Sequence, residues 1–66
     1  MSDVQVIVTP AAKRRTRNYY FAVCVADATG AARDLPGVDR YEANAVAAAR
    51  LIAHLHARVW VEKRAS

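Results

Sequence analysis

Apolar residues occupy every second position in three stretches of the chain, and each of these stretches predicts a β-strand. The first covers residues 3–9, where three valines alternate with Gln5, Ile7 and Thr9. The second covers residues 18–27, and the third covers residues 58–63, where Val59 and Val61 alternate with Arg58, Trp60 and Glu62. Pro10 follows the first stretch and lacks a backbone donor, so it ends that strand or leaves it at a sheet edge.

The second stretch is the strongest strand prediction because both of its faces are largely apolar. Tyr19, Phe21, Val23 and Val25 share one face, and Tyr20, Ala22, Cys24 and Ala26 share the other. The first face carries the larger side chains, so we expect it to lie under the helix. The second face is half-exposed, or it is covered by a second copy or a partner, because a solvated face of an antiparallel sheet would be more polar.

Residues 44–57 have the composition of an α-helix of about four turns, with no Gly or Pro. Spacings of three and four predict the inward stripe, which comprises Ala45, Ala48, Ile52, Leu55 and His56, with Ala49 and Leu51 at its margins. The start of the helix has two interpretations. In one, Asp39 caps it and Glu42 completes a capping box. In the other, residues 38–43 form a third strand with Tyr41 and Ala43 inward, and Asn44 is the cap. We favour the second because it needs only short connections.

These elements predict a single domain over residues 1–66 with the order β-β-(β)-α-β. The fold class is α+β: a small antiparallel sheet of three to four strands with one helix packed on one face. A chain of 66 residues is close to the lower size limit for an independent core, and much of its apolar content is Ala. A homodimer formed through the second sheet face is therefore one expected arrangement.

The charge of the chain is concentrated in one segment. Ten Lys and Arg residues against six Asp and Glu residues give a net charge of +4. Four of the cations are Lys13, Arg14, Arg15 and Arg17, so the remaining six cations balance the six acids. They lie in residues 11–18, which have no apolar period and predict an exposed loop or a hairpin tip.

Clustered cations of this kind favour three roles: contact with nucleic-acid phosphates, contact with an acidic protein surface, or solubility alone. Tyr19 and Tyr20 follow directly and could stack on bases. No helix-turn-helix or zinc pattern accompanies the segment, so it predicts no specific base readout.

Trp60 is the only tryptophan, and Val59 and Val61 claim the inward face of its strand. We therefore expect Trp60 on the other face, beside Tyr20 and Cys24. It is either packed there by arginine stems or serves as an interface hot spot.

The remaining chemistry-bearing residues do not form a catalytic or metal-binding pattern. Cys24 is the only cysteine, which excludes an intramolecular disulfide and fits a reducing cytoplasmic setting. His54 and His56 are two positions apart, whereas metal-binding pairs on a helix are three or four apart. We expect a surface His54, a half-buried His56, and no metal, cofactor or enzymatic activity. The N-terminus does not read as a signal peptide, no stretch is long enough to span a membrane, and the chain reads as a complete small protein.

The stretch YEANAVAAARLIA, residues 41–53, resembles a pattern in small bacterial and phage domains, in which a strand, a polar cap, an Ala-rich helix and a last strand follow one another. Several anti-CRISPR proteins and other phage regulators share this layout. Residues 19–56 are also similar to the arm-binding domains of tyrosine integrases, although residues 58–63 add a strand that those domains lack. The resemblance implies a phage or mobile-element source. The function predicted is a non-enzymatic protein that binds nucleic acid or a nucleic-acid-handling complex, and the alternative is a protein–protein inhibitor.

Overall fold

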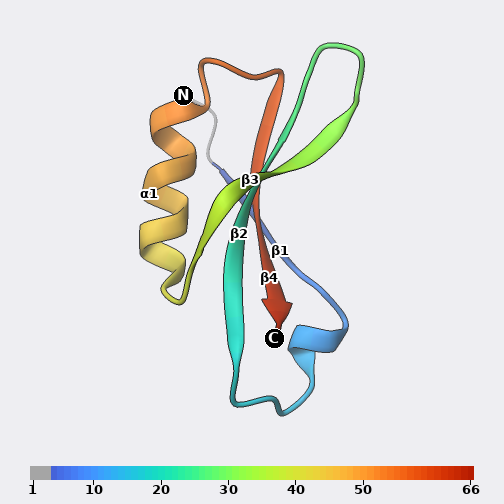
Figure 1. The fold of residues 1–66 in the computed structure, drawn as a ribbon, viewed down its shortest axis with the longest axis vertical. Helices are drawn as coiled ribbons and strands as arrows, with labels where there is room; N and C mark the ends of the chain where they lie inside the picture. Colours follow the sequence, from blue (N-terminus) through green and yellow to red (C-terminus); the bar gives the residue numbers. More distant parts are fainter. Residues whose placement is uncertain (1–3) are drawn as a thin grey trace.

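The computed structural model describes residues 4–66 and contains four strands and one α-helix (Figure 1). The elements are β1 (Gln5–Val8), a short 3-10 helix η1 (Ala11–Lys13), β2 (Tyr19–Ala26), β3 (Ala32–Asp39), α1 (Glu42–Ile52) and β4 (Arg58–Ala65). The strands form one sheet in the order β1-β4-β2-β3, and α1 packs against one face of it. The predicted α+β class is therefore confirmed.

The sheet is mixed and not purely antiparallel as predicted, because one of its three strand pairs is parallel. β2 pairs antiparallel with both β3 and β4, whereas β1 pairs parallel with β4. β4 thus lies between β1 and β2, so the hairpin-tip alternative for residues 11–18 is wrong. The segment instead passes the end of β4, where the Thr9 amide donates to the Lys63 carbonyl at 3.1 Å and the Ser66 amide donates to the Asn18 carbonyl at 3.2 Å.

β3 differs from the expected third strand, which was placed over residues 38–43. It begins at Ala32, directly after the turn from β2, and it continues through Pro36 and Gly37 to Asp39. These two residues predict a break, but β3 is an edge strand, where the missing amide of proline is tolerated. Gly37 has a φ of 98°, which only glycine adopts readily, and the β2–β3 register shifts between Ala22 and Cys24.

α1 begins at Glu42, between the two predicted starts. Tyr41 is its N-cap and has extended backbone, and the Asp39 carboxylate accepts a hydrogen bond from the Tyr41 amide at 2.8 Å. Tyr41 is therefore exposed and does not point inward as a strand residue. The helix ends at Ile52, five residues before the predicted end at Ala57.

The buried side of α1 also differs from the predicted stripe. Ala45 and Ala49 are buried, whereas Ala48, Leu51 and Leu55 are exposed. The sheet face under α1 already holds Phe21 and several valines, so the fully buried helix positions are alanines, and Val46 packs at the margin of the cluster. The expectation that Ala48 and Leu55 close the core is therefore wrong, whereas Ile52 is half-buried.

Two apolar clusters lie on opposite faces of the sheet. The cluster under α1 comprises Phe21, Ala45, Ala49 and Val61, with Val4, Val6, Val23, Val46 and Val59 packed around it. The cluster on the other face comprises Ala22, Cys24, Ala26 and Trp60, flanked by Ile7 and Tyr20. The predicted faces of the second and last strands are confirmed. On the face away from α1, every member of the cluster, Trp60 included, is at most 9% exposed.

Candidate nucleic-acid interface

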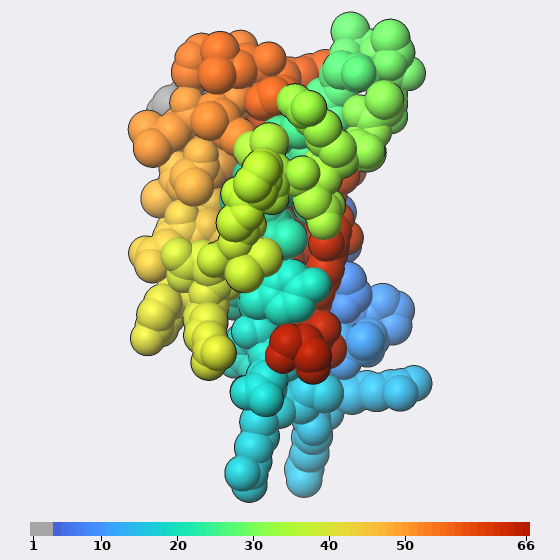
Figure 2. Space-filling model, in the orientation of Figure 1, coloured from blue at the N-terminus to red at the C-terminus, as the bar shows by residue number. Residues whose placement is uncertain are grey.

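The four clustered cations Lys13, Arg14, Arg15 and Arg17, hereafter the basic end, lie at one end of the longest axis of the molecule, opposite the β2–β3 turn (Figure 1). All four are exposed, and Figure 2 shows long side chains of this segment extending past the ends of the strands. The molecule measures 35 × 22 × 20 Å, so its excess charge lies at one narrow end. The predicted exposure of this segment is confirmed.

A short helical turn fixes the start of the basic end. Pro10 opens η1 with a φ of −56°, and the Thr9 hydroxyl accepts a hydrogen bond from the Ala12 amide at 3.3 Å. Ala12 is buried and anchors the turn, whereas Lys13 and the residues after it face solvent. The backbone is extended again at Arg14, and its carbonyl accepts from the Thr16 amide at 2.7 Å. The cations are therefore presented by a backbone that has its own hydrogen bonds.

Nearby acids do not neutralise the basic end. Within residues 4–66, none of its four side chains forms an ion pair. The acidic side chains with assigned partners bind other groups. Asp34 and Glu62 pair with Arg64, Asp27 accepts hydrogen bonds from its own turn, and Asp39 accepts from the Tyr41 amide. These four clustered positive charges produce a positive potential that extends into solvent and attracts anions.

The two tyrosines that follow the basic end face opposite sides of the sheet. Tyr19 lies on the α1 side and is 39% exposed, with its ring edge-on to Phe21 at 6.0 Å between centroids. The Lys63 ammonium sits over the Tyr19 ring, 4.0 Å from its centroid. Tyr20 is half-buried beside the second cluster. Lys63 therefore adds a fifth cation to this end, and one face of the Tyr19 ring is already occupied.

Trp60 lies apart from the basic end. It pairs in register with Cys24, four positions along β2 from Tyr20, or about 13 Å along the strand. The ring is only 9% exposed: its Nε1 donates to Glu62 at 3.2 Å, and the Arg58 guanidinium lies 4.8 Å from the ring centroid. This matches the expected packing by an arginine stem. A role for Trp60 in partner binding stays a prediction.

A network of charged groups on the same face was not predicted. Arg64 donates to both Asp34 oxygens, one of them at 3.0 Å, and to Glu62 at 2.8 Å. Glu62 also accepts a hydrogen bond from the Cys24 thiol at 2.9 Å. That thiol, followed by Arg64 and Trp60, lowers the pKa of Glu62, whereas Arg64 is the main cause of the lowered pKa of Asp34. The period of two places Glu62 and Arg64 on one face, but Asp34 joins them only through the β2–β3 register.

Three potential metal ligands meet in this network. Single ligand atoms of Cys24, Asp34 and Glu62 lie within 4.8 Å of one another. The Arg64 guanidinium contacts all three and supplies the positive charge that a metal ion would bring. Burial, followed by the hydrogen bond to Glu62, raises the pKa of Cys24 to about 12, so the thiolate that a metal or a nucleophilic reaction needs is scarce at neutral pH. We assign the group as a structural ion network.

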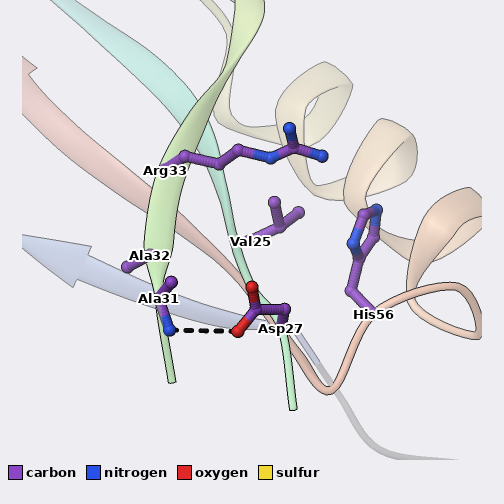
Figure 3. A pocket seen from close by; sticks show the side chains of 6 residues that line it. All are labelled: Val25, Asp27, Ala31, Ala32, Arg33 and His56. Carbon is purple, nitrogen blue, oxygen red and sulfur yellow. Dashed lines mark hydrogen bonds between the residues drawn. The ribbon is translucent and has the colours of Figure 1, made fainter. Parts of the chain in front are cut away.

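A hollow of about 250 Å³ lies at the end of the molecule away from the basic end. Arg33 comes from β3 and its side chain passes over Val25, and His56 comes from the turn after α1 and stands beside Val25 (Figure 3). Asp27 lies at the rim and accepts from the Ala31 amide at 3.1 Å. The half-buried His56 and the exposed His54 are as predicted. The hollow thus has the positive Arg33 and the negative Asp27 around the apolar Val25. This combination does not favour any one class of ligand.

Acid should weaken the ion network, and Arg64→Met should reduce that effect. Asp34 and Glu62 have lowered pKa values in the folded protein, so their contribution to stability is present above the unfolded values of 3.8 and 4.5 and is lost as pH falls through the folded values. We expect the substitution to lower the free energy of unfolding by about 1–2 kcal/mol at neutral pH. We also expect a shallower loss from pH 7 to pH 3, measured by urea unfolding.

Arg58→Met is the matched control, because Arg58 lies on the same face of β4 but contacts Trp60. It should leave the acid-induced loss unchanged. If Arg64→Met loses as much stability as the native chain between these pH values, the assigned role of Arg64 is wrong.

Compared with known proteins, the chain matches no protein-family description, no curated protein and no solved structure. Within residues 4–66, no helix has the length and apolar character needed to cross a membrane.

Proposed function

We propose that this protein is a non-enzymatic nucleic-acid-binding protein whose basic end contacts the phosphate backbone. The observation that carries this proposal is the position of Lys13, Arg14, Arg15 and Arg17: four exposed cations at one narrow end, with no ion pair among the described residues. Three of the four are arginines, whose planar guanidinium groups bind phosphate oxygens in pairs. Lys63 lies at the same end and can add to the attraction.

The contact proposed is with phosphates and does not depend on base sequence. Base stacking needs an open aromatic face, but Lys63 covers one face of Tyr19, and Tyr20 is half-buried on the opposite side of the sheet. Trp60 is about 13 Å farther along the strands and 9% exposed. Of the predicted site residues, only Tyr19 lies beside the four cations on one side of the sheet. Tyr20 lies on the opposite face of the sheet, and Trp60 lies farther along the strands.

Salt dependence of binding tests the proposal. If all four cations of the basic end displace counterions, the affinity for a labelled duplex of about 20 base pairs should fall by roughly two orders of magnitude between about 50 and 200 mM salt. Fluorescence anisotropy on duplex and single-stranded probes measures this. An affinity that does not respond to salt, or no binding at the lower concentration, would reject the proposal.

The alternative function is an inhibitor that docks on a protein complex, which also appears in the resemblance to anti-CRISPR proteins. The same cations could meet an acidic protein surface. Pull-down from a lysate with and without nuclease separates the two functions. Loss of all partners after nuclease supports nucleic-acid binding, and a protein that is retained supports the alternative. The phage or mobile-element source stays a prediction from the resemblance.

A further inference from the structure

Three large apolar side chains in or next to α1 face solvent, although Val46 of the same helix packs against the cluster under it and Ile52 is half-buried. Ala45 and Ala49 are 2% and 0% exposed against the sheet. Tyr41, Leu51 and Leu55, by contrast, are 71%, 76% and 66% exposed. A helix that only covers its own sheet places its large apolar residues inward. The exposure of these three side chains indicates a second contact on the outer side of α1.

The exposed residues form a continuous stripe along the helix. Tyr41, Asn44, Ala48, Leu51 and Leu55, hereafter the outer stripe, are separated by three, four, three and four positions, which is the spacing of a helix–helix seam. Leu55 follows the last residue of α1, but its amide donates to the Ile52 carbonyl at 2.9 Å, so the backbone continues turning through this position. None of the five side chains carries a charge.

We propose that the outer stripe binds the outer stripe of a second copy of this chain, with the two helices antiparallel and related by a two-fold axis at Ala48. Tyr41 and Leu55 lie seven positions on either side of Ala48, so each would meet the other across the axis. Asn44 and Leu51 lie four and three positions from Ala48, so they come close to each other across the axis without being exact equivalents. The smallest side chain lies at the crossing point, where it lets two helix axes approach to about 8 Å.

The size of the outer stripe fits a pair of identical copies that associates weakly. Its three large side chains expose roughly 400 Å² on each copy, or about 800 Å² for the pair. This total is below the area of about 1,000 Å² that a stable interface requires, so it fits a weak and transient pair. The opposite face of the sheet offers less, because every member of the second cluster, Trp60 included, is at most 9% exposed. This inference does not depend on the proposed nucleic-acid binding.

Sedimentation equilibrium without nucleic acid tests the pairing. We expect the native chain to dimerise with a dissociation constant of roughly 10–100 μM. Leu51→Lys should raise this constant at least tenfold. Ala47→Lys is the matched control: Ala47 is also exposed on α1 but lies off the outer stripe, so the constant should change by less than about threefold. A native chain that is monomeric at about 1 mM, or equal effects of the two variants, would overturn the proposal.

A cysteine at the proposed axis tests the geometry separately. Two copies of Ala48→Cys would bring their thiols together, so mild oxidation should yield a disulfide-linked dimer. Cys24 is 1% exposed and should not compete. Ala47→Cys should cross-link much more slowly. Cross-linking of both variants at one rate would overturn the antiparallel arrangement, and far-ultraviolet circular dichroism confirms that each variant is folded.

Discussion

Replacing Arg14, Arg15 and Arg17 together with Ala is expected to weaken binding to a nucleic-acid duplex by about a thousandfold at about 50 mM salt. Each cation that contacts a phosphate releases counterions, so three lost contacts also flatten the salt dependence to about a quarter of its native slope. The three side chains are exposed and form no ion pair within residues 4–66, so their removal should leave the free energy of unfolding almost unchanged. Fluorescence anisotropy across a salt series provides both values.

A matched pair of double variants separates position from net charge. Arg14→Ala with Arg15→Ala removes two charges at the basic end, and Arg33→Ala with Arg40→Ala removes two exposed charges elsewhere. The first pair should reduce the salt slope by about half, whereas the second should leave it near the native value. Equal losses would mean that overall charge attracts the nucleic acid and that the basic end has no special role.

The second large effect is expected from Ala49→Leu, at the most tightly enclosed position of α1. Ala49 is 0% exposed and packs in the cluster with Phe21 and Val61. A leucine there pushes the helix away from the sheet, which we expect to cost about 3 kcal/mol, at the upper end for overpacking. For a domain of this size, that loss lowers the melting temperature by roughly 10–20 °C. Thermal unfolding followed by circular dichroism measures it.

Ala48→Leu is the control for this substitution, because it adds the same side chain one position away on the exposed side of α1. At a low protein concentration, where self-association does not contribute, its melting temperature should lie within a few degrees of the native value. If Ala48→Leu were the more destabilising of the two, the helix would face the sheet as the sequence pattern predicts, and the observed orientation would be wrong.

Ala48 and Ala49 show that the pattern of apolar positions does not predict which face of α1 is buried. Five of the eleven residues of α1 are Ala, so its faces differ little in apolar character, and Leu51 and Leu55 favour the wrong side. Which face is buried depends on the space left by Phe21 and Val61, and that space is a property of the assembled sheet. The faces of β2 and β4 are predictable because side-chain direction in a strand alternates strictly and large residues mark one side.

The third strand was misplaced for a related reason. Pro36 and Gly37 predict a break in regular structure, and the edge position that tolerates them is visible only once the strand order is known. Because the predicted third strand begins after Asp34, the place of Asp34 in the ion network is not predictable either. Asp34 meets Cys24 only through the β2–β3 register. The basic end could be predicted because it is a local cluster of charges. Lys63 could not, because it reaches Tyr19 through pairing between strands far apart in the sequence.

The place of β4 between β1 and β2 also governs when the protein can fold during its synthesis. Gln5 pairs with Trp60, so β1 is separated from its partner strand by 55 positions in the sequence (60 − 5). Until the ribosome has released β4, the cluster under α1 lacks Val61 and the opposite cluster lacks Trp60. Such long-range pairing slows folding compared with local contacts. We therefore expect both apolar clusters of the nascent chain to form nearly at the same time, and only after β4 has left the ribosome.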